Sequence, residues 1–409
     1  MRKKLPHIDE LVASIIVALI VWGIGVSGLE LVTIEEKVLI TSGISRFILL
    51  LAAPIFLGFM SYFLVKWSHG YKGPHELIVV LKEKSSTFPG WVRATTTWII
   101  ACIELGSGLS PKGFEGPYIA AAGGLSGFLG TKMSLNSAAR RRLARCGLGV
   151  AFGLLFRTPL GGFICTFEFG GFEKKEFWKQ LPTAIIATTV NIWLMNTTKL
   201  PSPFQTLSAS SPLTIHQILL LLLIGIACGL TGLVYVFFIK LSKDIFKRLG
   251  KHIQFLFIPV LGATFSTLLG AFFPIILGSN ELSRVLTESP IIPLVAVGAI
   301  IAKIIATASA DGSKMAGGTV GPAILIGGMI GELIGGINPL FATAGSAAII
   351  GPIAGIPFTM LLTAITWLGF TPLALIIILP IIISKIICWG TELYPYIPSI
   401  TKSWPKELN

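Results

Sequence analysis

The stretch S-P-K-G-F-E-G-P-Y-I-A-A-A-G-G, residues 110–124, decides the fold of this chain, because it places one carboxylate, Glu115, among glycines and a proline beside an apolar run. Small residues also serve tight helix packing, so a few glycines that recur at equal spacing could do so by chance. A G-x-x-G-P pattern that recurs after half the chain indicates duplicated halves instead. At a constant offset of 205 residues, Gly113, Gly116, Pro117, Gly123 and Gly130 recur as Gly318, Gly321, Pro322, Gly328 and Gly335.

The composition is that of a polytopic membrane protein. Hydrophobic residues make up 53% of the 409, charged residues 12%, and the mean hydropathy is +0.82. Three uncharged runs, 11–29, 47–65 and 217–239, each reach the roughly 20 residues that a helix needs to cross a bilayer. Asp9 and Glu10 interrupt the start of the first run, so we expect it to be a retained span and not a cleaved signal peptide.

The net charge of +13 does not predict a nucleic-acid partner. The basic residues gather in short connections, which is typical of positive-inside membrane topology. Five cysteines without C-x-x-C spacing and five scattered histidines predict no disulfide framework, no metal and no cofactor. The basic groups are Arg140, Arg141, Arg142, Arg145 and, later, Lys240, Lys243, Lys247, Arg248 and Lys251.

Residues 339–384 carry no charged side chain over 46 positions. At about 1.5 Å per residue, one helix of this length would be roughly twice as long as the bilayer is thick. We therefore expect it to break, and fragments too short to span the membrane are tolerated only inside protein or along a cavity, as in transporters. The expected breaks are Gly351-Pro352, Gly355, Pro357, Gly369 and Pro372.

The repeated motif predicts two helix N-termini, one just after Gly116-Pro117 and one just after Gly321-Pro322. The first N–H groups of a helix have no intrahelical acceptor, and the positive end of the helix dipole lies there. Flanking glycines let the backbone approach a ligand closely. Two such ends near the bilayer centre would form a site for a small anion.

These motifs resemble the CLC family of chloride channels and chloride/proton antiporters. Gly113-Phe114-Glu115-Gly116-Pro117 is similar to the family's G-R/K-E-G-P, and Gly318-Thr319-Val320-Gly321-Pro322 to its G-x-F-x-P. The position of its G-S-G-x-P is held by Gly70-Tyr71-Lys72-Gly73-Pro74. The resemblance covers nearly the whole chain, about residues 10–400.

The resemblance implies an all-α polytopic membrane protein, built as an inverted repeat of tilted, partly broken helices. It would form a single transmembrane domain over 1–409, with repeat halves at 10–200 and 210–390 and a C-terminal helix, 391–409, that carries Tyr394. Only 15 residues follow Tyr394, so we expect a prokaryotic type without cytoplasmic CBS domains.

The resemblance also implies roles for individual residues. Glu115 would be the gate, and Tyr394 would help to hold the anion, although a tyrosine of the interfacial aromatic belt is the alternative for Tyr394. The expected anion-binding residues are Tyr71, Phe114, Gly116, Thr319, Val320 and Tyr394, with the motif backbone at Gly113, Pro117, Gly318, Gly321 and Pro322.

Three departures from the family pattern concern the pore. Phe114 replaces the cation before the gate, so a positive charge expected near Glu115 is absent. Tyr71 replaces the serine that reaches the anion, and Val320 replaces the aromatic of G-x-F-x-P. Together they leave a fluoride-selective transporter as an alternative to a chloride transporter.

A fourth departure concerns protons. Pro159-Leu160-Gly161-Gly162 aligns with the stretch that precedes the antiporters' internal proton acid. Glu168 then matches a glutamate that channels and antiporters share, and Phe169 stands where the internal acid is expected. This favours chloride transport with weak or no proton coupling; proton-coupled antiport is the alternative.

An intramembrane enzyme acting on lipid-linked substrates, with Glu115, Glu168 or Asp311 as acid or base, is a hypothesis from another class. No nucleophile–base pair or metal cluster supports it, so we expect no enzyme. Asp311 and Lys314, three residues apart, suggest a local ion pair, and the role of Glu104 stays open. The resemblance implies as partners chloride or another small anion, protons under the antiporter hypothesis, membrane lipid and a second copy in a homodimer. It also implies a bacterial inner membrane as the location.

Overall fold

The computed structural model describes most of the chain. The described residues are 8–41, 46–67, 77–78, 80–81, 91–171, 174–198, 214–254, 257–277, 293–370 and 372–394. Two residue-level predictions fall outside them: Tyr71, and the C-terminal helix beyond residue 394.

The described part of the chain is helical and contains no β-strand, which confirms the predicted all-α fold class. The first half comprises α1 (Ile8–Thr41), α2 (Arg46–Trp67), α4 (Trp91–Gly106), α5 (Glu115–Lys132), α6 (Ser137–Leu155), α7 (Pro159–Glu168) and α8 (Lys174–Thr198). The second comprises α9 (Ile215–Leu249), α10 (Phe257–Phe272), η1 (Pro274–Ile276), α12 (Pro293–Gly312), α13 (Val320–Gly335), α14 (Pro339–Ala354), α15 (Pro357–Leu368), η2 (Pro372–Ile377) and α16 (Ile378–Ile387).

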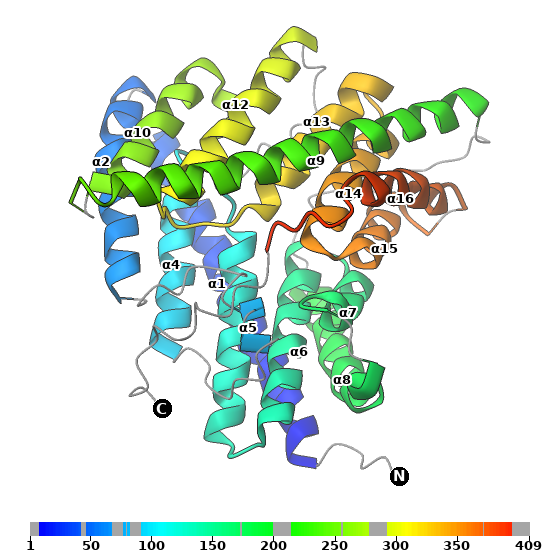
Figure 1. Cartoon of the computed structure of the whole chain (residues 1–409). Helices are drawn as coiled ribbons and strands as arrows, with labels where there is room; N and C mark the ends of the chain where they lie inside the picture. The colour runs from blue at the N-terminus through cyan, green and yellow to red at the C-terminus, as the bar shows by residue number, and fades with distance from the viewer. Residues whose placement is uncertain are drawn as a thin grey trace.

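The helices form two groups that meet in the middle of the molecule (Figure 1). The long tilted α9 packs on α12, α14 and α16, while α5, α6, α7 and α8 pack on one another in chain order. The N-terminal ends of α5 and α13 lie where the two groups meet, and α5 contacts α13 directly. The fold therefore brings together the two copies of the repeated motif.

Among the described residues, three helices are long and apolar enough to cross a membrane: Ile8–Glu35 within α1, α9 and α12. The predicted spans at 11–29 and 217–239 are among them. The predicted span at 47–65 also forms a helix, α2, but its apolar part, Leu50–Phe63, belongs to the shorter class of 10 to 17 residues. Short apolar helices of this kind also include α10, α13, α14 and α15.

The uncharged run at 339–384 is broken as predicted, with one exception. Helix α14 ends at Ala354 and is capped by Gly355, whose φ of 73° lies in the left-handed region that glycine tolerates best. Helix α15 begins at Pro357, ends at Leu368 and is capped by Gly369. The predicted break at Gly351-Pro352 is wrong, because Pro352 lies inside α14. Its carbonyl accepts a hydrogen bond from Lys385 Nζ at 3.1 Å, and packing on neighbouring helices supports the turn.

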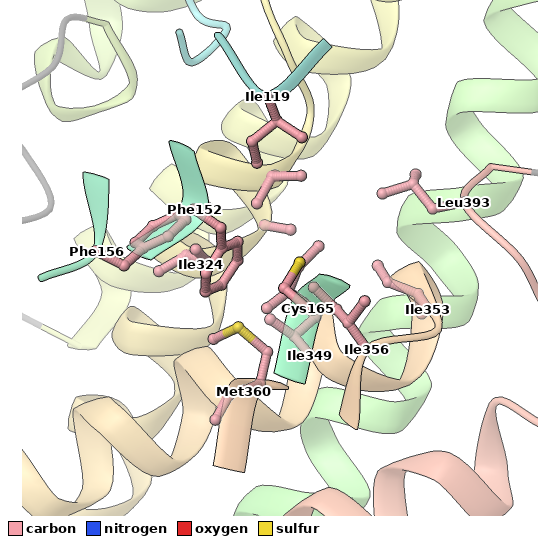
Figure 2. Close-up of a cluster of buried hydrophobic side chains, with 14 of the residues drawn as sticks. Ile119, Phe152, Phe156, Cys165, Ile324, Ile349, Ile353, Ile356, Met360 and Leu393 are labelled. Carbon is pink, nitrogen blue, oxygen red and sulfur yellow. The ribbon is translucent and has the colours of Figure 1, made fainter. Parts of the chain in front are cut away.

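A buried apolar cluster fills the space between the two groups of helices (Figure 2). Ile119 of α5 and Ile324 of α13 occupy equivalent positions in the two motif copies, and both belong to this core. Met360 of α15 and Cys165 of α7 join them there. All five cysteines are free and buried, as expected of packing residues.

Glu168 has a structural task in this fold. Its Oε2 accepts hydrogen bonds from the backbone N–H of Thr359 at 2.8 Å and from the Thr359 hydroxyl at 2.7 Å. Its Oε1 accepts one from the N–H of Phe358 at 3.0 Å. The last residue of α7 thereby caps the N-terminus of α15, where the N–H groups have no helical acceptor.

Replacing this cap should destabilise the fold. We expect Glu168→Ala to lower the free energy of unfolding by about 1–3 kcal/mol, because two N–H donors at the start of α15 and the Thr359 hydroxyl lose their acceptor. Thermal unfolding in detergent, followed by tryptophan fluorescence, measures the change. Glu30→Ala, at an exposed position of α1, is the control and should leave the midpoint unchanged; equal midpoints for both variants would contradict the capping role.

Candidate functional site

Two helix N-termini without side-chain caps form the centre of the site. Helix α5 begins at Glu115 and α13 at Val320, so both start slightly earlier than predicted and contain Gly-Pro in their first turn. Their N-cap residues, Phe114 and Thr319, make no side-chain capping hydrogen bond. Because the third residue of each helix is a proline, the N–H groups of the first two residues remain as donors at each end.

The two motif loops are bound to each other. Gly113 and Gly318 form an isolated antiparallel bridge, in which the N–H of Gly113 donates to the carbonyl of Gly318 at 3.0 Å and the N–H of Gly318 donates in return. A Cβ on Gly318 would lie 2.7 Å from the nitrogen of Gly116, closer than real Cβ atoms come. Glycine at 318 therefore sets how closely the two helix ends approach.

The carboxylate of Glu115 lies between these ends. A Cβ added to Gly321 would collide with both carboxylate oxygens of Glu115, and a Cβ added to Gly113 would collide with Glu115 Oε2. The backbone N–H groups of Glu115 itself and of Gly321 act on the carboxylate. Its Oε2 is buried and has no hydrogen-bond partner among the described residues. The predicted gate residue thus occupies the position between the two N-termini.

A buried cation stands near Glu115 although Phe114 removed the one expected from the motif. Lys303 of α12 is 2% exposed, its Nζ donates to the carbonyl of Ile276 at 2.6 Å, and its charge acts on the Glu115 carboxylate. Lys303 was not predicted, because this positive charge comes from a helix that is distant from the motif in sequence. A lysine inside the otherwise uncharged run 293–310 was the available signal.

Hydroxyl groups gather at the N-cap of α13. The Thr319 and Tyr394 hydroxyls lie 3.0 Å apart, and the Tyr235 hydroxyl donates to the Thr319 carbonyl at 2.8 Å. Tyr394 is partly buried against the core. The N–H of its neighbour Leu393 donates to the carbonyl of Ile353 at 2.8 Å, and both of these residues belong to the cluster in Figure 2. Tyr235, fully buried on α9, was not predicted.

Three of the residues that depart from the family pattern lie in the described part of the chain, and each packs against its neighbours. The Phe114 ring contacts Trp98 of α4 at a centroid separation of 5.7 Å, and Val320 is buried in the first turn of α13. Phe169, at the C-cap of α7, is 3% exposed and belongs to the apolar core. No carboxyl group stands at position 169, and the neighbouring Glu168 carboxylate is directed at α15.

Comparison with known proteins agrees with this geometry. The family model described as "Voltage gated chloride channel" matches residues 10–388. The chain belongs to the CLC family. This CLC protein is accordingly an integral, multi-pass membrane protein of a transporter and channel family.

Its relatives in sequence are distant. "Chloride channel protein 1" of Rattus norvegicus is 27% identical over 188 residues, which are 42% of this chain and 18% of the relative. "Chloride channel protein 2" of Drosophila melanogaster is 28% identical over 168 residues, 37% of this chain and 14% of that one. The matched segment thus spans less than a fifth of the curated relatives.

Solved structures match over the whole fold. A slow cyanobacterial Cl−/H+ antiporter superposes with a TM-score of 0.78 at 17% identity and covers 95% of this CLC protein and 97% of its own chain. A CLC-type fluoride/proton antiporter gives 0.76 at 22% identity, covering 95% and 96%. At these identities the likeness establishes the fold alone.

The approach of the two helix ends can be tested at Gly318. We expect Gly318→Ala to separate Gly318 from Gly116, with roughly 1–3 kcal/mol of overpacking strain, and to weaken chloride binding measured by calorimetry in detergent. Gly23→Ala is the control, since an added methyl group there meets no atom within 4 Å. Unchanged chloride affinity in a folded Gly318→Ala protein would show that this close approach does not shape the site.

Proposed function

We propose that this CLC protein moves chloride across the membrane through a central site between the N-termini of α5 and α13, and that Glu115 gates this site. The observation that carries the proposal is the Glu115 carboxylate, which lies against Gly321 and Gly113 between two uncapped helix ends. A buried carboxylate in a transmembrane protein is a functional candidate by default.

The gating follows from the electrostatics of the helix ends. Backbone N–H groups and the positive ends of two helix dipoles stabilise any small negative charge between them. The ionised carboxylate of Glu115 and a chloride ion therefore compete for one place. When Glu115 is protonated it loses this attraction, so its side chain can leave and an anion can enter.

The surrounding residues support an anion without forming a tight ion pair with it. Lys303 contributes a positive potential, while its Nζ is already bonded to the Ile276 carbonyl. The hydroxyls of Thr319 and Tyr394 are donors at the N-cap of α13. An anion held by dipoles, hydroxyls and a nearby cation can bind and still leave, as conduction requires.

Proton coupling is proposed to be weak or absent. Phe169 is buried in the apolar core and can neither accept nor release a proton. Proton-coupled chloride antiport and fluoride transport are the alternatives, and the structural neighbours described as Cl−/H+ and fluoride/proton antiporters are what favours them. The enzymatic hypothesis loses support, because Asp311 is paired with two lysines and Glu168 caps α15.

The gate is tested by neutralising Glu115. Wild-type chloride efflux from proteoliposomes should rise as the pH falls, because protonation removes the competing charge. In Glu115→Gln the efflux should be independent of pH and at least as fast as that of the wild type at neutral pH. A variant that keeps the wild-type pH dependence would refute Glu115 as the gate; Glu392→Gln, at an exposed position, is the matched control.

Proton coupling is tested separately. A chloride gradient across proteoliposomes should drive chloride movement without uphill proton movement, recorded with a pH electrode, because position 169 carries phenylalanine. Proton movement against its gradient would establish the antiporter alternative. Fluoride that outcompetes chloride in the same efflux assay would establish the fluoride alternative.

A further inference from the structure

A group of polar and charged side chains contacts the two motif loops through bonds other than those of the Glu115 carboxylate. It is called here the buried ion cluster. Its members come from α2, α4, α9 and α12 and from the loop before α5, and none of them belongs to the proposed anion site. They are Ser61, Glu104, Lys112, Lys243 and Asp311.

Lys112 links the first motif loop to the second half of the chain. It stands directly before Gly113, its side chain is 3% exposed, and its Nζ lies 2.8 Å from Asp311 Oδ1. The same Nζ donates to the carbonyl of Met315, in the second motif loop, at 3.2 Å. Lys243 of α9, half exposed, binds the other Asp311 oxygen at 2.9 Å. Asp311 was expected to pair with Lys314, but its carboxylate binds two lysines that are remote in sequence.

Glu104 and Ser61 hold the second motif loop from the other side. The Ser61 hydroxyl donates to Glu104 Oε1 at 2.6 Å and accepts the backbone N–H of Ala316 at 3.1 Å. Glu104 is 1% exposed, and its Oε2 has no hydrogen-bond partner within the described residues. Ala316 stands two residues before Gly318, so this chain of bonds ends beside the bridge between the two loops.

Lys112 and Lys243 both bind Asp311, and the charge of Lys112 acts on Glu104 as well. Lys243 lies on α9, the helix that also carries Tyr235, whose hydroxyl donates to the Thr319 carbonyl. Buried ions in a low-dielectric interior need partners, so removing one charge forces the others to rearrange.

We propose that Asp311, with Lys112 and Glu104, positions the gate: the buried ion cluster fixes the separation of the two helix N-termini between which the anion binds. The inference rests on the proposed anion site but not on proton coupling. The Gly113–Gly318 bridge alone joins the loops at one point. The cluster adds a second connection between the loops through Lys112 and Met315, and Ser61 ties Ala316 of the second loop to α2 and to Glu104 of α4, the helix that precedes the first loop. Together these bonds prevent the loops from turning about the bridge.

The test compares anion selectivity, because a change in protein stability alone alters the amount of folded protein and not the ratio of two fluxes. We expect Asp311→Asn and Lys112→Met to change the thiocyanate-to-chloride flux ratio in proteoliposomes by about twofold or more, in the same direction, and their effects to be non-additive. Lys112→Arg, which keeps the charge and the donors, should retain the wild-type ratio.

Two further variants keep the test decisive. Lys243→Gln removes the half-exposed partner of Asp311, so it should fold and shift the ratio in the same direction by less. Glu10→Gln breaks a buried ion pair with Arg142, at 2.6 and 2.8 Å, that bonds neither motif loop, and it should leave the ratio unchanged. A wild-type ratio in all cluster variants, or an equal shift in Glu10→Gln, would overturn the positioning role.

Failure of the gate and failure of this inference are distinguishable. If Glu115→Gln keeps the wild-type pH dependence while Asp311→Asn shifts the flux ratio, the gate assignment fails and the positioning role stands. If Glu115→Gln behaves as expected while the cluster variants keep the wild-type ratio, only the positioning role fails.

Discussion

The structure depends on one electrostatic constraint: two helices begin inside the protein, and their first N–H groups have no acceptor from a side-chain cap. In a low-dielectric interior such donors need a negative partner. The group that lies between the two helix ends here is the carboxyl of Glu115, which belongs to one of them. A site that the protein's own acid can fill is also a site that a mobile anion can fill.

Small residues make this meeting of helix ends geometrically feasible. The bridge between Gly113 and Gly318 brings two backbones into contact, and Gly321 leaves room for the carboxylate. Larger side chains would keep the dipoles apart and weaken their combined field, which decreases with distance. The apolar cluster in Figure 2 then fixes the two helices, since Ile119 and Ile324 pack into one core.

Some features of the structure were predictable from the sequence, and others were not. The broken run at 339–384 was predictable, because Gly355 and Pro357 impose local backbone conformations whatever lies around them. The continuation of α14 through Pro352 was not predictable, because a helix tolerates an internal proline when neighbouring helices support that turn. The location of Glu115 beside the helix N-termini was predictable from its motif. Lys303 and Tyr235 were missed, since each reaches the site from a helix distant in sequence.

The sequence by itself determined the membrane class, the helical fold, the family motifs and the isolated carboxylate, because these depend on composition, local backbone preference and short-range spacing. The two halves at 10–200 and 210–390 stay a prediction from the repeat. Only the tertiary structure decided which charged residues interact. Asp311 pairs with Lys112 and Lys243, and the charge of Lys303 acts on Glu115, whose preceding residue is Phe114. Electrostatic partners are set by distance in space, and the sequence does not encode that distance locally.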